Sequence, residues 1–132
     1  MNTTTGILVE VSAGELIDKI TILEIKADRI ADPQKLENVR RELAVLCRAR
    51  DAAIGASPEL ESLIGELKAV NEALWQVEDE IRECERNRDF GPSFIGLARR
   101  VYQSNDRRAA LKRQINQLLG SRLIEEKAYV TY

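Results

Sequence analysis

Apolar residues recur along most of the chain at alternating spacings of three and four, which place them on one face of an α-helix. The longest of these stripes runs from Leu60 to Cys84 without interruption, and shorter ones lie on either side of it. A stripe of this kind packs against neighbouring helices. The pattern therefore predicts an all-α chain with four helices, at residues 13–31, 33–54, 58–89 and 92–119.

Each predicted helix is bounded by residues that suit a helix terminus. Ser12 and Glu15 have the spacing of a capping box, in which the serine hydroxyl accepts a hydrogen bond from a backbone amide. Asp32 and Ser57 are each followed by a proline, which fits the first position of a helix. Gly120 suits the left-handed residue that often ends a helix. These signals divide the chain into four helices joined by short connections.

Short connections make consecutive helices antiparallel neighbours. We therefore predict a single domain of residues 1–132, built as an antiparallel four-helix bundle of two helical hairpins. The β-branched and aromatic segments 7–11 and 128–132 are compatible with short extended termini that pair with each other or with a neighbouring chain. The uninterrupted stripe from Leu60 to Cys84 also offers a surface for a second copy, so a homodimer is among the predicted partners.

Composition narrows the chemistry that the chain can carry. The formal charge is −2, with 20 basic residues, 22 acidic residues and no histidine. The lack of histidine excludes a Ser-His-Asp site, a Cys-His site and any histidine-ligated metal. The two cysteines, Cys47 and Cys84, lie within helical patterns and are predicted to be reduced core residues. We therefore predict no metal site and no cofactor.

Two further features bear on location. No apolar run approaches the roughly 20 residues that a membrane-spanning helix needs. Residues 1–5 carry no basic region and start no signal-peptide core, so we expect a cytoplasmic protein without a membrane span.

Charge is distributed unevenly between the two halves of the second predicted hairpin. Residues 57–89 carry ten acidic and four basic side chains, whereas residues 90–122 carry one acidic and seven basic ones. Net charges of −6 and +6 predict a charge-matched pair of helices. The basic residues are scattered around their helix without interleaved aromatics, which disfavours nucleic acid as a partner.

A second stripe, of polar and aromatic residues, lies beside the apolar one on the third and fourth predicted helices. Folding the hairpin near residue 91 brings these stripes together, and the first helix adds charged groups. We call the combined surface the polar seam, which comprises Glu15, Asp18, Lys19, Asn71, Trp75, Glu78, Arg82, Tyr102, Asn105, Arg108 and Lys112. One interpretation is a buried polar layer that fixes helix register. The other is a pocket with Trp75 and Tyr102 as flat walls and charged side chains as specificity groups.

Four blocks of sequence also carry a family resemblance, at residues 14–26, 71–82, 94–109 and 120–129. In order and spacing they resemble a small bacterial all-helical family of unknown function. The resemblance implies a compact helical unit, with some members encoded near enzymes of glycan or cell-envelope assembly. The family has no settled active site, so the resemblance assigns no catalytic residue to this chain.

The leading hypothesis is a non-catalytic helical binding or interaction module, linked through this resemblance to glycan or envelope assembly. It would recognise a protein partner or an anionic small molecule at the polar seam. The alternative is an enzyme acting on a phosphorylated or carboxylated metabolite, with Glu15, Asp18 and Glu78 as Mg²⁺ ligands or acid/base groups. Thermal shifts with Mg²⁺ and nucleotides would separate the two hypotheses.

Overall fold

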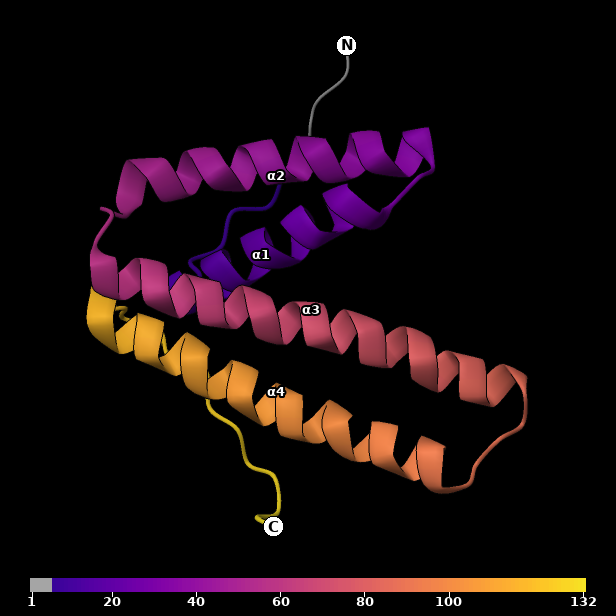
Figure 1. Ribbon diagram of the computed structural model, residues 1–132. Helices are drawn as coiled ribbons and strands as arrows, with labels where there is room; N and C mark the ends of the chain where they lie inside the picture. Colours follow the sequence, from indigo (N-terminus) through magenta and orange to yellow (C-terminus); the bar gives the residue numbers. More distant parts are fainter. Residues whose placement is uncertain (1–5) are drawn as a thin grey trace.

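The computed structural model describes residues 6–132 as four helices without a strand, which confirms the all-α fold class. The helices are α1 (Ala13–Arg29), α2 (Pro33–Ala53), α3 (Pro58–Arg86) and α4 (Pro92–Leu119) (Figure 1). All four begin at the predicted residue, whereas α1, α2 and α3 end slightly earlier than predicted. Residues 1–5, which the prediction of a cytoplasmic protein used, lie outside the described residues.

Side chains cap the first three helices as their sequences predict. The hydroxyl of Ser12 accepts from the amide of Glu15, and the hydroxyl of Ser57 accepts from the amide of Leu60. Asp32 accepts from the first amides of α2 in the same way. These acceptors satisfy amides that have no partner within the helix, so they fix where each helix begins.

The end of α3 differs most from the prediction, at Arg86 rather than residue 89. Arg88 adopts a left-handed backbone conformation with φ of 55°. The amide of Asp89 then bonds back to the carbonyl of Cys84 at 2.9 Å, which closes the helix. Glycine usually occupies such a position, and its absence from residue 88 explains why the sequence did not reveal the turn.

The helix α1 is the centre of the arrangement, because it contacts α2, α3 and α4. Of the four described helices, α2 packs against α1 alone. Helices α3 and α4 lie side by side and extend past the end of α1, joined by residues 87–91 (Figure 1).

The main core lies at the end of the α3–α4 pair that is remote from this connection. Its members come from α1, α3 and α4 and are all at most 2% exposed: Ile17, Leu60, Leu67, Leu111 and Ile115. Cys47 and Cys84 are free and only half-buried, contrary to the expectation that they are core residues. The segments 7–11 and 128–132 form neither helix nor strand. The chain therefore has a packed end at the core and a projecting end around residues 87–91.

Candidate functional site

The first turn of α1 lies directly on the last turns of α4. The amide of Gly14 donates to Oδ1 of Asn116 at 2.6 Å, and the amide of Ala13 donates to the hydroxyl of Ser121 at 3.3 Å. A Cβ atom at residue 14 would collide with the carbonyl oxygen of Lys112 and lie 2.9 Å from Asn116 Oδ1. The glycine thus permits a close approach of the two backbones, which places the following turns of α1 against α4.

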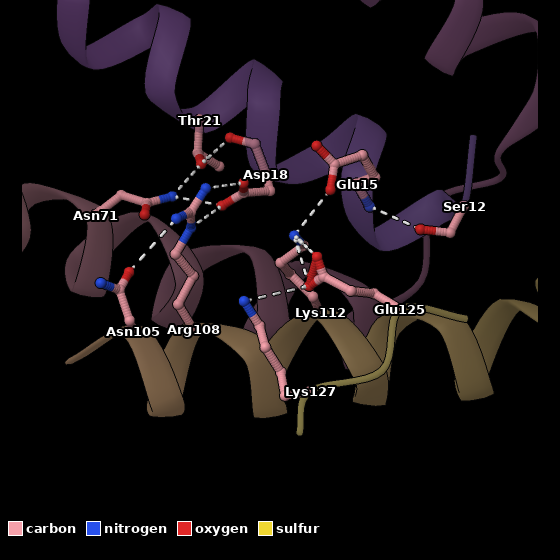
Figure 2. Close-up of polar contacts among 10 residues, drawn as sticks. All are labelled: Ser12, Glu15, Asp18, Thr21, Asn71, Asn105, Arg108, Lys112, Glu125 and Lys127. Atoms are coloured by element: carbon pink, nitrogen blue, oxygen red, sulfur yellow. Dashed lines mark hydrogen bonds and ion pairs between the residues drawn. The ribbon is translucent and has the colours of Figure 1, made fainter. Parts of the chain in front are cut away.

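This approach buries Asp18 completely, with 0% of the residue exposed. Arg108 donates to both carboxylate oxygens of Asp18, at 2.9 Å from Nε and 2.5 Å from Nη2 (Figure 2). The side-chain amide of Asn71 donates to the same carboxylate at 3.0 Å and lies 2.8 Å from the hydroxyl of Thr21. One carboxylate of α1 is therefore tied to both α3 and α4 by charge-assisted hydrogen bonds.

A second cation, which is buried, lies one helical turn along α4 from the half-buried Arg108. Lys112 is 6% exposed, and its ammonium donates to Glu15 of α1 at 2.8 Å and to Glu125 at 3.3 Å. Lys127 approaches the same Glu125 carboxylate at 4.0 Å (Figure 2). This group ties α1 and the segment after α4 to one lysine. We call the whole set the buried network: Glu15, Asp18, Thr21, Asn71, Arg108, Lys112 and Glu125.

The pKa values of both cations are raised above their ordinary values. For Arg108 the hydrogen bond to Asp18 is the main cause, and burial offsets part of it. For Lys112 burial lowers the pKa, but the hydrogen bond to Glu15 and the charges of Glu15, Asp18 and Glu125 outweigh it. Both side chains therefore stay protonated, and the buried network contains no unpaired charge. Within residues 6–132, every buried side-chain nitrogen or oxygen has a hydrogen-bond partner.

An open groove borders the buried network where α1 ends and α3 and α4 continue. Its volume is about 570 Å³. We call it the Trp75 groove, and its lining is Ile22, Ile25, Asn71, Leu74, Trp75, Glu78, Asp79, Arg82, Asn105 and Arg108. Arg29 of α1 lies over the Trp75 ring, 5.9 Å from its centroid. Apolar side chains and paired charges therefore share one half-open surface.

The charges that line the groove are mostly paired. Arg82 forms an ion pair with Glu78 one turn earlier on α3, and Arg108 is held by Asp18. Asp79 makes no ion pair with any residue that the structure describes. The groove consequently presents one free negative charge beside apolar walls.

The structure brings together nine of the eleven residues of the predicted polar seam. Six line the Trp75 groove, namely Asn71, Trp75, Glu78, Arg82, Asn105 and Arg108. Three more belong to the buried network beneath it, namely Glu15, Asp18 and Lys112.

Two predicted residues lie elsewhere. Lys19 faces α2 and pairs with Glu42 at 3.5 Å. Tyr102 packs edge-on against Tyr132 with ring centroids 5.2 Å apart, so it does not form a second wall opposite Trp75. Both residues lie close to the seam in helical spacing, but the orientation of each helix turns them to another neighbour.

Four residues that complete the site were not predicted, namely Thr21, Asn116, Ser121 and Glu125. Thr21 stands three residues after Asp18 on the same helical face, which was a usable signal. Asn116 was on the polar stripe of α4 but was not assigned a partner. Ser121 and Glu125 lie in a segment without regular structure, where helical spacing carries no information.

The carboxylates of the alternative enzyme hypothesis do not converge. Glu15 binds Lys112, Asp18 binds Arg108, and Glu78 binds Arg82. Residues 6–132 contain no group of three or more histidine, cysteine, aspartate or glutamate side chains that could hold a metal ion. None of the four described helices is both long and apolar enough to cross a membrane.

Fold and site together define an all-helical protein with a buried ion-pair layer and an adjoining half-apolar groove. A family model described as "Family of unknown function (DUF6165)" matches residues 7–132, so the chain belongs to that family. This confirms the resemblance to a family of unknown function that the four sequence blocks carry. No curated protein and no solved structure shows a significant match to the chain.

Proposed function

We propose that this chain is a non-catalytic binding module that holds a segment of a partner protein in the Trp75 groove. The observation that supports this most is the contrast between the groove and the network beneath it. The walls offer apolar area from Ile22, Ile25, Leu74 and Trp75, whereas the buried ion pairs hold α1, α3 and α4 in place. A preformed apolar groove on a rigid support lowers the ordering cost of binding a peptide segment.

The pairing of the charged residues that line the groove favours a protein partner over an anionic small molecule. Both arginines that line the groove are already paired with carboxylates of the chain. An anion that bound Arg108 would leave the fully buried Asp18 without its charged partner, which costs several kcal/mol. At Arg82 it would compete with the carboxylate of Glu78. The free charge of Asp79 instead suits a lysine or arginine of the partner. The preferred ligand is therefore an amphipathic segment with an apolar anchor for Trp75 and a basic residue close to it.

The same contacts give less support to the enzyme alternative, because Glu15, Asp18 and Glu78 each neutralise a different cation. The cytoplasmic location and the link to glycan or envelope assembly stay predictions, which no contact of the described residues tests.

Trp75 is the only tryptophan of the chain, so its fluorescence reports directly on the groove. Amphipathic peptides selected from a displayed random library against the wild-type protein serve as the probe. We expect the selected peptides to carry an aromatic or aliphatic residue within one helical turn of a lysine or arginine, and to shift the emission of Trp75. Trp75→Ala, whose binding is followed by calorimetry because it lacks the fluorophore, should not bind the peptides. Asp79→Asn should weaken binding about tenfold, as expected for a rim charge.

Glu80→Gln is the matched control, because it removes an acidic charge from the other side of the same turn of α3 and should leave the affinity unchanged. Peptides that bind equally well to Trp75→Ala and Asp79→Asn would contradict the proposal. A rise in Tm with Mg²⁺ and a nucleotide, in a protein that selects no peptide, would support the enzyme alternative instead.

A further inference from the structure

Two segments without regular structure leave the packed end of the molecule with their apolar side chains in solvent. In the first, Ile7, Leu8 and Val9 are 89%, 98% and 72% exposed. In the second, Tyr129 and Val130 are 76% and 93% exposed. No backbone–backbone hydrogen bond joins residues 7–11 or 123–132 to the rest of the described chain. Each segment therefore has the composition of a strand and an unpaired backbone.

Side chains nevertheless hold the second segment along α4. Glu126 forms an ion pair with Arg113 at 3.0 Å, in addition to the bond between Glu125 and Lys112. The hydroxyl of Tyr132 donates to Asp106 at 2.5 Å. The segment is thus held along α4 by side chains while its backbone stays without a hydrogen-bonded partner, as in an exposed edge strand.

A hollow of about 530 Å³ lies between this segment and α4. Tyrosine rings dominate its lining, which is Val101, Tyr102, Asn105, Asp106, Lys127, Tyr129, Val130 and Tyr132. Aromatic side chains pair well with aliphatic β-branched ones across adjacent strands. The hollow therefore suits a short aliphatic strand.

The first segment has that composition, and it is anchored close to the second. Glu10 forms an ion pair with Arg122, and the amide of Ala13 bonds to Ser121. From this shared origin the two segments run in different directions (Figure 1), so they do not pair within the chain. The sequence left two options, pairing within one chain or with a neighbour, and the structure leaves the second.

We propose that the chain forms a two-fold dimer in which residues 7–11 of each copy add as a strand to residues 128–132 of the other. The aliphatic segment 7–11 and the hollow that suits it lie on the same chain. A second copy therefore offers a partner to each of them. Because each copy gives and receives a strand, the interface occurs twice and closes under two-fold symmetry. Main-chain hydrogen bonds supply affinity, and the tyrosine-lined hollow receives alternate aliphatic side chains.

The first test is the mass of the full chain in solution by light scattering, at micromolar and at sub-millimolar concentrations. The wild type should reach twice the 14.9 kDa of one chain as concentration rises. Leu8→Asp and Val130→Asp should each remain monomeric throughout. Both should keep the wild-type Tm at low concentration, because their side chains are almost fully exposed in the single chain. Val45→Asp, which changes a half-exposed valine of α2, is the matched control and should still dimerise.

Mixing the two variants tests the reciprocal exchange itself. A mixed dimer of Leu8→Asp and Val130→Asp retains one unaltered interface, whereas each variant alone retains none. We therefore expect the mixture to dimerise, and a chain that carries both substitutions to dimerise with neither single variant. Amide hydrogen exchange should slow in residues 8–10 and 129–131 as the dimer forms.

A wild type that stays monomeric at every concentration would overturn the proposal. So would a dimer that survives in Leu8→Asp or Val130→Asp, because it would use another surface. A mixture that remains monomeric would exclude the reciprocal arrangement.

Discussion

At the start of α1, Gly14 sets the distance between two helices. Its amide bonds to Asn116, and the position of its missing side chain is occupied by the backbone of Lys112. Backbone atoms of a helix interior cannot move aside as a flexible side chain can. Asp18 and Glu15 therefore reach their partners on α4 because residue 14 has no side chain.

We predict that Gly14→Ala destabilises the protein by about 1–3 kcal/mol, the cost of overpacking a close contact. Gly65→Ala is the matched control, because residue 65 lies in α3 with open space where a Cβ would be. That substitution should stabilise the protein by about 0.5–1 kcal/mol through helix propensity. Urea unfolding of both variants measures the two changes. Equal effects of the same sign would show that residue 14 is not a contact position.

The residues of the site were predictable where helical periodicity alone decides their position. Asn71, Glu78 and Asn105 lie on stripes that can be read from spacing, and they do line one groove. Periodicity does not state which of several neighbours a stripe faces, so Lys19 and Tyr102 were assigned to the wrong surface.

At the scale of helices, the charge asymmetry of α3 and α4 has a different use from the one predicted. Among residues 6–132, a single ion pair joins these two helices, between Glu66 and Arg107. The other paired cations of α4 bind α1 or the segment that follows α4: Arg108, Lys112 and Arg113. The net charge of a segment indicates that its charged residues have ion-pair partners. Which residues those partners are depends on how all the helices pack. The sequence alone could not supply that packing.

Lys112 joins α1, α4 and residues 121–132 through its ion pairs. The pH dependence of the free energy of unfolding tests this role. Replacing it with methionine should cost about 1–3 kcal/mol at neutral pH, because Glu15 and Glu125 lose a charge-assisted partner. The pKa of Lys112 is raised in the folded state, so its stabilising effect is complete below the unfolded value of about 10.4. The effect is lost as pH rises through the higher folded value.

Urea unfolding of wild type and Lys112→Met at several pH values measures this difference. We expect it to stay constant from pH 7 to about 10 and to shrink above that. Lys35→Met, at an exposed residue of α2, is the control and should show little difference at any pH. A gap that widens with alkaline pH would mean that the folded state binds the Lys112 proton less tightly than inferred.

The whole molecule is unequal in stability, because its four helices do not share one core. Val39 is the only buried residue of α2, whereas α1 buries residues toward several neighbours. The ion pair between Lys19 and Glu42 is exposed and contributes less than about 1 kcal/mol. We therefore regard α2 as an attached helix and α1, α3 and α4 as the cooperative body.

Native-state hydrogen exchange should show this division directly. Amides of α2 should exchange at least about tenfold faster than those of α3 around Leu67, because few buried contacts resist local opening. Val39→Ala should speed exchange in α2 further and leave α3 and α4 unchanged. Exchange of all four helices at one common rate would indicate a single cooperative unit.

The central place of α1 also has a consequence for how the chain reaches this structure. Its first turn bonds to Ser121, 108 residues away, whereas α3 and α4 are separated by a few residues. Contacts that close long loops form late because they cost more chain entropy. A growing chain emerges from the ribosome with its N-terminal part first, so α1 exists for some time without the helices that cover it. During synthesis, Ile17 is open to chaperones and to aggregation until the end of α4, which supplies its core partners Leu111 and Ile115, has been made.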